Sequence, residues 1–260
     1  MIELRTQVES LGDRVLGAVD VAGEFFLLGV QTVRAAFRGE FPVHETMVQF
    51  DALVVRSTAI VTLTALFTGM VLALQTVVSL TRFGAKPYTG SFVGLAFVLE
   101  LGPVLTALMV SGRVGAGITA ELGSMAVTEQ VDAIRAMGAD PVQKLVLPRV
   151  FALTFGLPML TSLAYILGIA GGALIAQQYG ITTNFYLQTV INVVTVNDVL
   201  ESLSKTFVFG WMIATVGCYL GLKTTGGTVG VGRATTTAVV VASIGVLVSN
   251  FFLAKMLMLV

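Results

Sequence analysis

Residues 57–81 read STAIVTLTALFTGMVLALQTVVSLT, a run without a single charged side chain. A helix needs about 20 mostly apolar residues to cross the roughly 30 Å hydrocarbon core of a membrane, so this run is long enough to span it. Four further mostly apolar runs follow, at residues 88–112, 150–176, 201–221 and 234–259. The sequence therefore predicts an all-α membrane protein with five transmembrane helices.

The composition of the whole chain agrees with this prediction. Of 260 residues, 55% are hydrophobic and 12% are charged, whereas a soluble domain carries about 25% charged residues. The 15 basic residues balance 15 acidic ones, which leaves no net positive field for nucleic acid. The single cysteine, Cys218, and the single histidine, His44, exclude a disulfide framework and a histidine-rich metal site.

Residues 177–197 also lack charge, but they are rich in Gln, Asn, Thr and Tyr. We interpret this stretch as an outside loop that carries a short interfacial helix. A sixth span at 181–197 is the alternative.

The basic residues indicate the orientation of the chain. With five spans, 11 of the 15 Lys and Arg residues fall on the side of the N-terminal segment, the 112–149 loop and the 222–233 loop. The other side receives only Arg82, Lys86 and Lys255. Because Lys and Arg accumulate in cytoplasmic loops, we expect a cytoplasmic N-terminus and a periplasmic C-terminus.

The first 50 residues form a segment distinct from the permease domain that we expect at 51–260. Its apolar residues recur at steps of three and four, and they are Val15, Val19, Ala22, Phe26, Val30, Val33 and Phe37. This pattern predicts an amphipathic helix that lies in the membrane interface. Packing on a soluble partner is the alternative.

Two glycine-rich stretches look like nucleotide sites but lack the required context. Residues 115–120 (GAGITA) follow a membrane helix rather than a strand, and residues 227–232 are followed by Arg233 and Ala234 where a phosphate loop has Lys and Ser or Thr. We therefore expect no enzyme activity in this chain. The pairs Gly90/Gly94, Gly168/Gly172 and Gly217/Gly221 are interpreted as packing contacts between spans.

The loop between the second and third predicted spans contains a short predicted helix at 129–137. Thr128 is a good N-cap and Gly138 a good C-cap for it. The stretch from Asp132 to Gly138, followed by Leu145 to Pro148, resembles the loop by which ABC importer permeases dock their ATPase, although its second half is three residues shorter. An ordinary interfacial connector is the alternative. The candidate coupling residues are Glu129, Asp132, Ala133, Arg135, Gly138 and Asp140.

Several motifs together resemble the MlaE/YrbE permease family. They are ELGP at 100–103, SGRVGAGITAELG at 111–123, TEQ at 128–130, DP at 140–141, GMVLALQ at 69–75 and GRATT at 232–236. Members of that family are inner-membrane subunits of bacterial ABC systems that move phospholipid or other lipids between inner and outer membranes and maintain outer-membrane lipid asymmetry. The resemblance implies a homodimer, a separate P-loop ATPase that holds ATP and Mg, an MCE-domain substrate-binding protein and, in many systems, a STAS-domain protein.

The resemblance also implies a lipid cavity between two copies of the chain. The positions carried over are Leu72, Gln75, Ser79, Leu80, Phe83, Leu99 and Leu101. Members often have Arg where this chain has Leu99, which puts head-group recognition by that residue in doubt. Arg82 or Lys86 could compensate, and replacing both by Gln without a change in lipid binding would remove this hypothesis.

Charged residues inside the spans are costly and call for partners. For Glu100 we favour a structural role, with a proton-linked or cavity role as the alternative. Glu201 and Lys205 have the i, i+4 spacing of an ion pair. Arg113 and Glu121 are expected to pair across a turn and to brace the coupling region. Rival interpretations are an ion-driven secondary carrier that uses Glu100 and Glu201 as proton sites, an intramembrane enzyme, and a scaffold.

Overall fold

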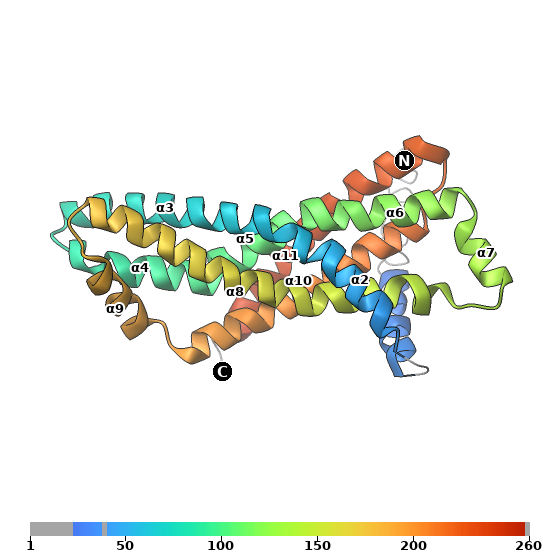
Figure 1. Ribbon diagram of the computed structural model, residues 1–260, viewed down its shortest axis with the longest axis horizontal. Coiled ribbons are helices and arrows are strands. Elements are labelled where there is room, and N and C mark those ends of the chain that lie inside the picture. The colour runs from blue at the N-terminus through green and yellow to red at the C-terminus, as the bar shows by residue number, and fades with distance from the viewer. Residues whose placement is uncertain (1–22, 38–40, 258–260) are drawn as a thin grey trace, which may run out of the picture.

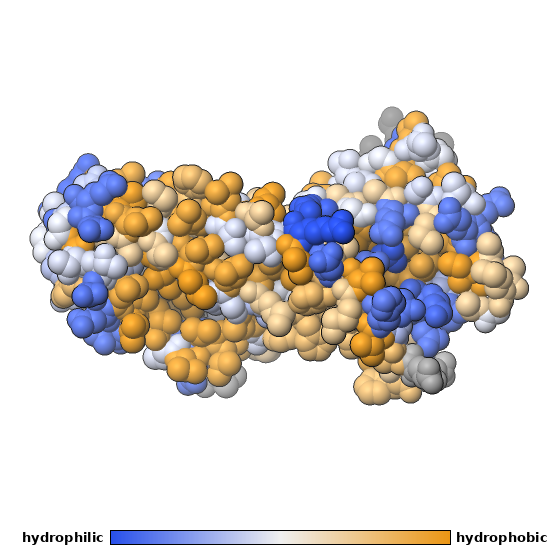
Figure 2. Space-filling model, viewed as in Figure 1, coloured by the Kyte–Doolittle hydropathy of each residue, from blue (hydrophilic) through white to orange (hydrophobic). Residues whose placement is uncertain are grey.

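A computed structural model describes residues 23–37 and 41–257, which form helices and turns without a β-strand. Five helical segments in this part are long and apolar enough to cross a membrane, as the sequence predicts. They run along an elongated molecule, and the short helices α7 and α9 lie at its opposite ends (Figure 1). Hydrophobic side chains cover much of the half of the visible surface that leads to α9, whereas hydrophilic ones gather at that end and are mixed with hydrophobic ones from the centre to the α7 end (Figure 2).

Most of the long segments are built from several helical pieces. The first comprises α2 (Val43–Leu53), η1 (Val55–Ser57) and α3 (Thr58–Arg82). The second comprises η2 (Lys86–Tyr88), α4 (Thr89–Ala96), η3 (Phe97–Leu101), α5 (Gly102–Val110), η4 (Ser111–Gly115) and α6 (Ala116–Val127). The third comprises η5 (Val142–Val146) and α8 (Leu147–Gln178), and the last two are α10 (Val196–Leu222) and α11 (Gly227–Leu257).

The helices extend beyond the apolar runs from which they were predicted. The second segment continues past Arg113 and Glu121 to Val127, because charged residues such as Arg and Glu are good helix formers and do not end a helix. The fourth begins at Val196, where Thr195 and Asp198 form a capping box. Hydropathy therefore located the crossings, and a capping box sets the start of α10.

The stretch between the third and fourth segments contains a short helix, α9 (Thr183–Val193). Its 11 residues are too few to cross a membrane, so the alternative of a sixth span is wrong. Tyr186 and Val190 anchor it in a small core with Val77 and Val93 of α3 and α4.

Close backbone approach holds the long helices together. A Cβ on Gly69 of α3 would lie 1.9 Å from the Gly168 carbonyl oxygen of α8. The absence of a side chain at Gly69 therefore allows the two helix backbones to approach this closely. The glycine pairs of the sequence analysis are confirmed as packing positions, since a Cβ on any of their six members would meet another helix within 3.2 Å.

The described part of the N-terminal segment, residues 23–37, is helical and packs on α10 of the same chain. Leu28 and Thr32 are buried, and Phe25 stands edge-on to Trp211. Of the predicted apolar stripe, Val15, Val19 and Ala22 lie outside the described residues, whereas Phe26, Val33 and Phe37 are exposed. Val30, which also belongs to that stripe, is half-buried, so the described part of this helix packs through Leu28 and Thr32 and leaves Phe26, Val33 and Phe37 exposed.

Glu24 fastens this helix to the end of α10. Its carboxylate accepts hydrogen bonds from the Lys223 ammonium and from the Tyr219 hydroxyl, the latter at 2.7 Å. The bond from Lys223, followed by that from Tyr219, lowers the pKa of Glu24 below the usual glutamate value. The same contact raises the pKa of Lys223. Both directions mean that the charged pair stabilises the docked helix.

We expect acid to release this helix. A carboxylate whose pKa is lowered on folding contributes stability above its unfolded pKa, and this contribution is lost as the pH falls through the folded value. Trp211 is the only tryptophan and contacts the helix through Phe25 and Gly29. Its emission should therefore shift with a midpoint below the usual glutamate pKa in wild type, and the shift should disappear in Glu24→Gln. A midpoint above that value would contradict the assignment.

Candidate functional site

The second long segment is broken at its centre, next to the intramembrane carboxylate. In the π-helical turn η3, the Gly102 N–H bonds to the Phe97 carbonyl five residues back, and Pro103 has no N–H to donate. The carbonyls of Val98 and Leu99 therefore lose their usual intrahelical donors. Such carbonyls need other donors inside a membrane protein.

Side chains of α10 supply those donors. The Ser202 hydroxyl donates to the Val98 carbonyl at 2.5 Å and accepts from the Tyr165 hydroxyl of α8 at 2.5 Å. The Lys205 ammonium donates to the Leu99 carbonyl at 3.2 Å. The break in one helix is thus repaired by its neighbours, which fixes the position of the residues around Glu100.

Lys205 also forms an ion pair with Glu100, and the two charges differ in burial. Nζ of Lys205 lies 3.2 Å from Oε1 of Glu100, and their side chains are 5% and 43% exposed. The Asn250 amide of α11 donates to Oε2 of Glu100 at 2.7 Å. The cluster Glu100–Lys205–Asn250 therefore joins η3, α10 and α11 at the centre of the protein.

The expected pair between Glu201 and Lys205 is wrong. Lys205 turns into the protein toward Glu100 and the Leu99 carbonyl, while Glu201 lies half-buried one turn earlier on α10. A buried ammonium gains more from a carboxylate together with a carbonyl that lacks a donor than from a single carboxylate. Because Lys205 and Asn250 occupy both oxygens of Glu100, the geometry favours a structural role for this carboxylate.

The lipid-cavity candidates lie on two separate elements. Gln75, Ser79 and Phe83 follow one another at four-residue spacing and are exposed, so they share an open face of α3. The other four are half-buried, Leu72 and Leu80 on α3, Leu99 and Leu101 in η3. A single chain therefore presents the α3 candidates outward rather than closing them into a pocket.

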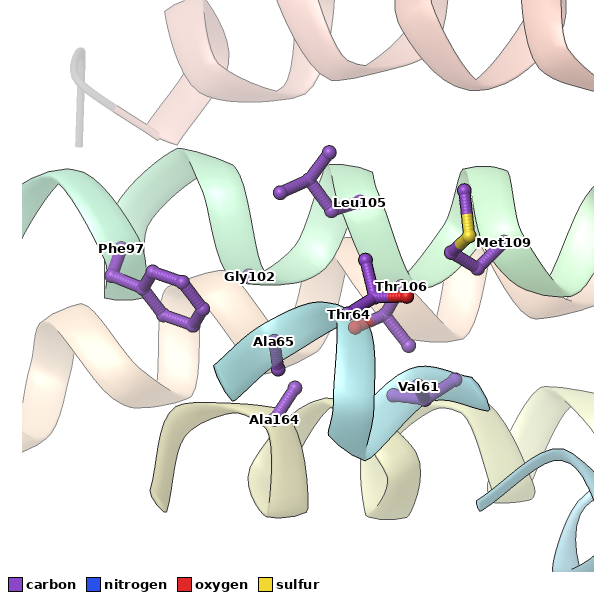
Figure 3. A pocket seen from close by; sticks show the side chains of 9 residues that line it. All are labelled: Val61, Thr64, Ala65, Phe97, Gly102, Leu105, Thr106, Met109 and Ala164. Atoms are coloured by element: carbon purple, nitrogen blue, oxygen red, sulfur yellow. The ribbon is translucent and has the colours of Figure 1, made fainter. Parts of the chain in front are cut away.

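A small apolar hollow lies between α3, the η3–α5 break and α8 (Figure 3). It is lined by Val61, Thr64, Ala65, Phe97, Gly102, Leu105, Thr106, Met109 and Ala164. Sequence reasoning missed these residues because small residues at helix contacts look like packing residues. The small side chains at Ala65, Gly102 and Ala164 are the signal that could have indicated space there.

The helix expected at 129–137 is α7 (Gln130–Ala136), and its start differs from the prediction. Thr128 does not cap it, because its hydroxyl donates to the Ser124 carbonyl at 2.8 Å and so closes the preceding helix α6. Glu129 makes the turn instead, in the left-handed region with φ 59°. Gly138 follows α7 with φ 79°, where glycine is strongly preferred.

The six coupling candidates all lie on the surface at one end of the molecule. Glu129, Asp132, Ala133, Arg135, Gly138 and Asp140 are exposed. Asp132 and Arg135 pair at 2.8 Å, and Oδ1 of Asp140 accepts the Val142 N–H at 2.9 Å. Val131 is the only buried residue of α7, so this short helix is largely exposed where it projects from one end of the molecule (Figure 1).

The expected pair between Arg113 and Glu121 is also wrong. Arg113 lies in the π-helical turn η4 and donates to the Ser57 hydroxyl at 2.6 Å. Glu121 pairs at 2.8 Å with Arg149, at the start of α8. Arg113 and Glu121 lie on one continuous helical segment, about 12 Å apart along its axis at 1.5 Å per residue, so no turn brings them together.

Comparisons with known proteins find relatives over most of the chain. The family described as permease MlaE matches residues 46–256. A probable ABC transporter permease protein of Synechocystis sp. is 42% identical over 88% of this chain and 87% of its own length. The intermembrane phospholipid transport system permease protein MlaE of Haemophilus influenzae is 34% identical over 95% of both chains. The chloroplastic protein TRIGALACTOSYLDIACYLGLYCEROL 1 of Arabidopsis thaliana is 36% identical over 88% of this chain and 66% of its own.

Proposed function

The chain belongs to the MlaE permease family, and from this membership we propose that it is the multi-pass inner-membrane subunit of an ABC transporter for phospholipid. The family match over residues 46–256 carries the proposal, because it spans all five long helical segments and the coupling loop. The name of the Haemophilus influenzae relative supplies phospholipid as the substrate class. Maintenance of outer-membrane lipid asymmetry is the cellular role that we infer.

In this proposal the chain hydrolyses no ATP, and a separate P-loop ATPase binds ATP and Mg. Support comes from α7, which projects from the end of two long segments and exposes charged side chains. An ATPase bound to α7 can transmit force to α6, which precedes α7 in the chain, and to η5 and α8, which follow it. The N-terminus and α7 then face the cytoplasm, and α9 and the C-terminus face the periplasm.

Two copies of the chain form the lipid cavity in this proposal. The segments that contain α3 and α11 bury the least of their apolar windows, 28% and 17%, against 50–67% for the other three. The open α3 face carries Gln75, Ser79 and Phe83, so pairing of two chains would enclose them. An MCE-domain protein at the periplasmic end would exchange lipid with the cavity, and a STAS-domain protein would act on the ATPase.

The ion-driven carrier is the weaker candidate. A proton site needs a carboxylate whose hydrogen-bond partners change when it is protonated. Glu100 is held by Lys205 and Asn250 on two different helices, and protonation would leave the buried Lys205 charge without its partner. This arrangement favours a structural ion pair.

Charge reversal on α7 tests the coupling assignment. Glu129→Lys with Asp132→Lys should lower binding of the ATPase by about tenfold or more, since close charge pairs at interfaces contribute strongly. The fold should be unaffected because both side chains are exposed. Binding is measured by pull-down from detergent-solubilised membranes. Asp51→Lys, a reversal at another exposed site, is the control, and equal ATPase recovery from all variants would count against docking at α7.

A further inference from the structure

The ion pair between Glu121 and Arg149 is the most unevenly buried charge pair on the side of α7. The Arg149 side chain is 4% exposed and that of Glu121 is 55% exposed. Nη2 of Arg149 meets Oε1 of Glu121 at 2.8 Å, and Nη1 donates to the Leu145 carbonyl at 2.7 Å. Nε finds no partner in the described part of the chain. The buried guanidinium therefore depends on Glu121 for its charge balance.

The pair closes the base of the coupling loop. Glu121 lies on α6 before the chain leaves for α7, and Arg149 lies in the first turn of α8 after the chain returns. Between them, the π-helical turn η5 and the prolines at 141 and 148 weaken the regular backbone hydrogen bonding. Arg149 bonds to both sides of this weak point, to α6 through Glu121 and to η5 through the Leu145 carbonyl.

Other contacts of this loop are weaker. Lys144 meets Glu45 of α2 at 3.8 Å, with both side chains about half-exposed, and Asp132 and Arg135 pair within α7. Exposed pairs of this kind contribute little to stability. The surroundings of Arg149 are different, because Leu122, Val146 and Val150 beside the pair are fully buried. A short pair whose arginine is buried is therefore the principal polar contact between the two ends of the loop in the described part of the chain.

We propose that Glu121 and Arg149 are positioning residues that clamp α6 to α8, so that a force applied at α7 moves both helices instead of deforming the loop. The part of this inference that concerns force rests on the proposed function. The clamp itself is a property of this chain and can be measured without any partner.

The clamp is tested by hydrogen exchange on the full chain in lipid nanodiscs. Glu121→Gln should lower the protection of amides at 130–136 and 142–146 by about tenfold or more, because local opening then no longer breaks the ion pair of the buried Arg149. Protection within 155–176 of α8 should not change. Lys144→Gln, which removes an exposed charge from the same loop, is the matched control. Wild-type protection of the loop in Glu121→Gln would overturn the clamp.

A second variant controls for misfolding caused by a buried charge that has lost its partner. The double change Glu121→Gln with Arg149→Met removes both charges, and such replacements of a buried pair are tolerated far better than removal of one partner. This variant should fold and still show the loosened loop. Full loop protection in it would mean that packing, and not the pair, holds the loop, and would overturn the proposal.

The transport consequence is measured in the complex with the ATPase. The double variant should assemble and hydrolyse ATP at the wild-type basal rate, but move several-fold less phospholipid for each ATP hydrolysed. A loosened loop with a wild-type ratio would refute the role in force transmission. If no ATPase associates with the wild-type chain, the proposed function fails, and the exchange experiment still decides whether the clamp exists.

Discussion

Replacing Glu100 by Leu is expected to destabilise the protein by about 3–5 kcal/mol, the range for removal of one partner from a buried ion pair. The reason is the burial of Lys205, whose side chain is 5% exposed and whose charge would be left facing only the Leu99 carbonyl. The Asn250 amide would lose its acceptor as well. The measurement is the free energy of unfolding in detergent micelles.

Variants of Lys205 distinguish the loss of this ion pair from a general loss of packing. Lys205→Met should cost less, about 1–3 kcal/mol, since Glu100 is 43% exposed and keeps Asn250 while the Leu99 carbonyl loses a donor. The double variant should be more stable than Glu100→Leu alone, because no buried charge remains. If Lys205→Met is the more damaging single change, the assignment of the buried partner is wrong.

Gly69→Ala is expected to destabilise the protein by about 3 kcal/mol or more, at the upper end for overpacked cores. The new Cβ would lie 1.9 Å from the Gly168 carbonyl oxygen, an atom of the backbone that no side-chain rotation can move. Relief requires α3 and α8 to separate, and this would disturb the contacts of Gly171 with Leu66 further along the same pair of helices.

Gly117→Ala is the matched control for this change. Gly117 also lies inside a helix, but a Cβ there meets no atom within 4 Å. It should leave stability unchanged or raise it by up to about 1 kcal/mol, because alanine favours the helix. Both variants are compared by thermal unfolding in the same detergent. Equal transition temperatures for Gly69→Ala and Gly117→Ala would contradict the close packing of α3 on α8.

The five membrane-spanning segments could be predicted from sequence because they depend on one local property, the hydropathy of consecutive residues. Runs such as 57–81 are apolar over the length that a membrane requires, and five helical segments of the described residues are long and apolar enough to cross it. Helix ends were predicted less well. Thr128 has the chemistry of an N-cap but caps the end of α6 instead, since the choice between two helices that share a boundary depends on the turn made by Glu129.

Charge pairing could not be predicted from spacing along one helix. Lys205 pairs with Glu100 of the neighbouring segment because it also donates to the adjacent Leu99 carbonyl. Pro103 leaves that carbonyl without an intrahelical donor. The proline was visible in the sequence, and a search for a donor to the carbonyl four residues before it could have found Lys205. Arg149 gave no such signal, because burial of the first turn of α8 follows only from the packing of the other helices.

The central claim is that this chain moves phospholipid under the control of a separate ATPase. The most direct test is phospholipid transfer out of proteoliposomes that contain the complex purified through a tag on this chain. We expect that an ATPase copurifies, that transfer requires ATP hydrolysis, and that collapse of the proton gradient has no effect. Transfer that follows a proton gradient without ATP, or transfer by a complex that contains no ATPase, would contradict it.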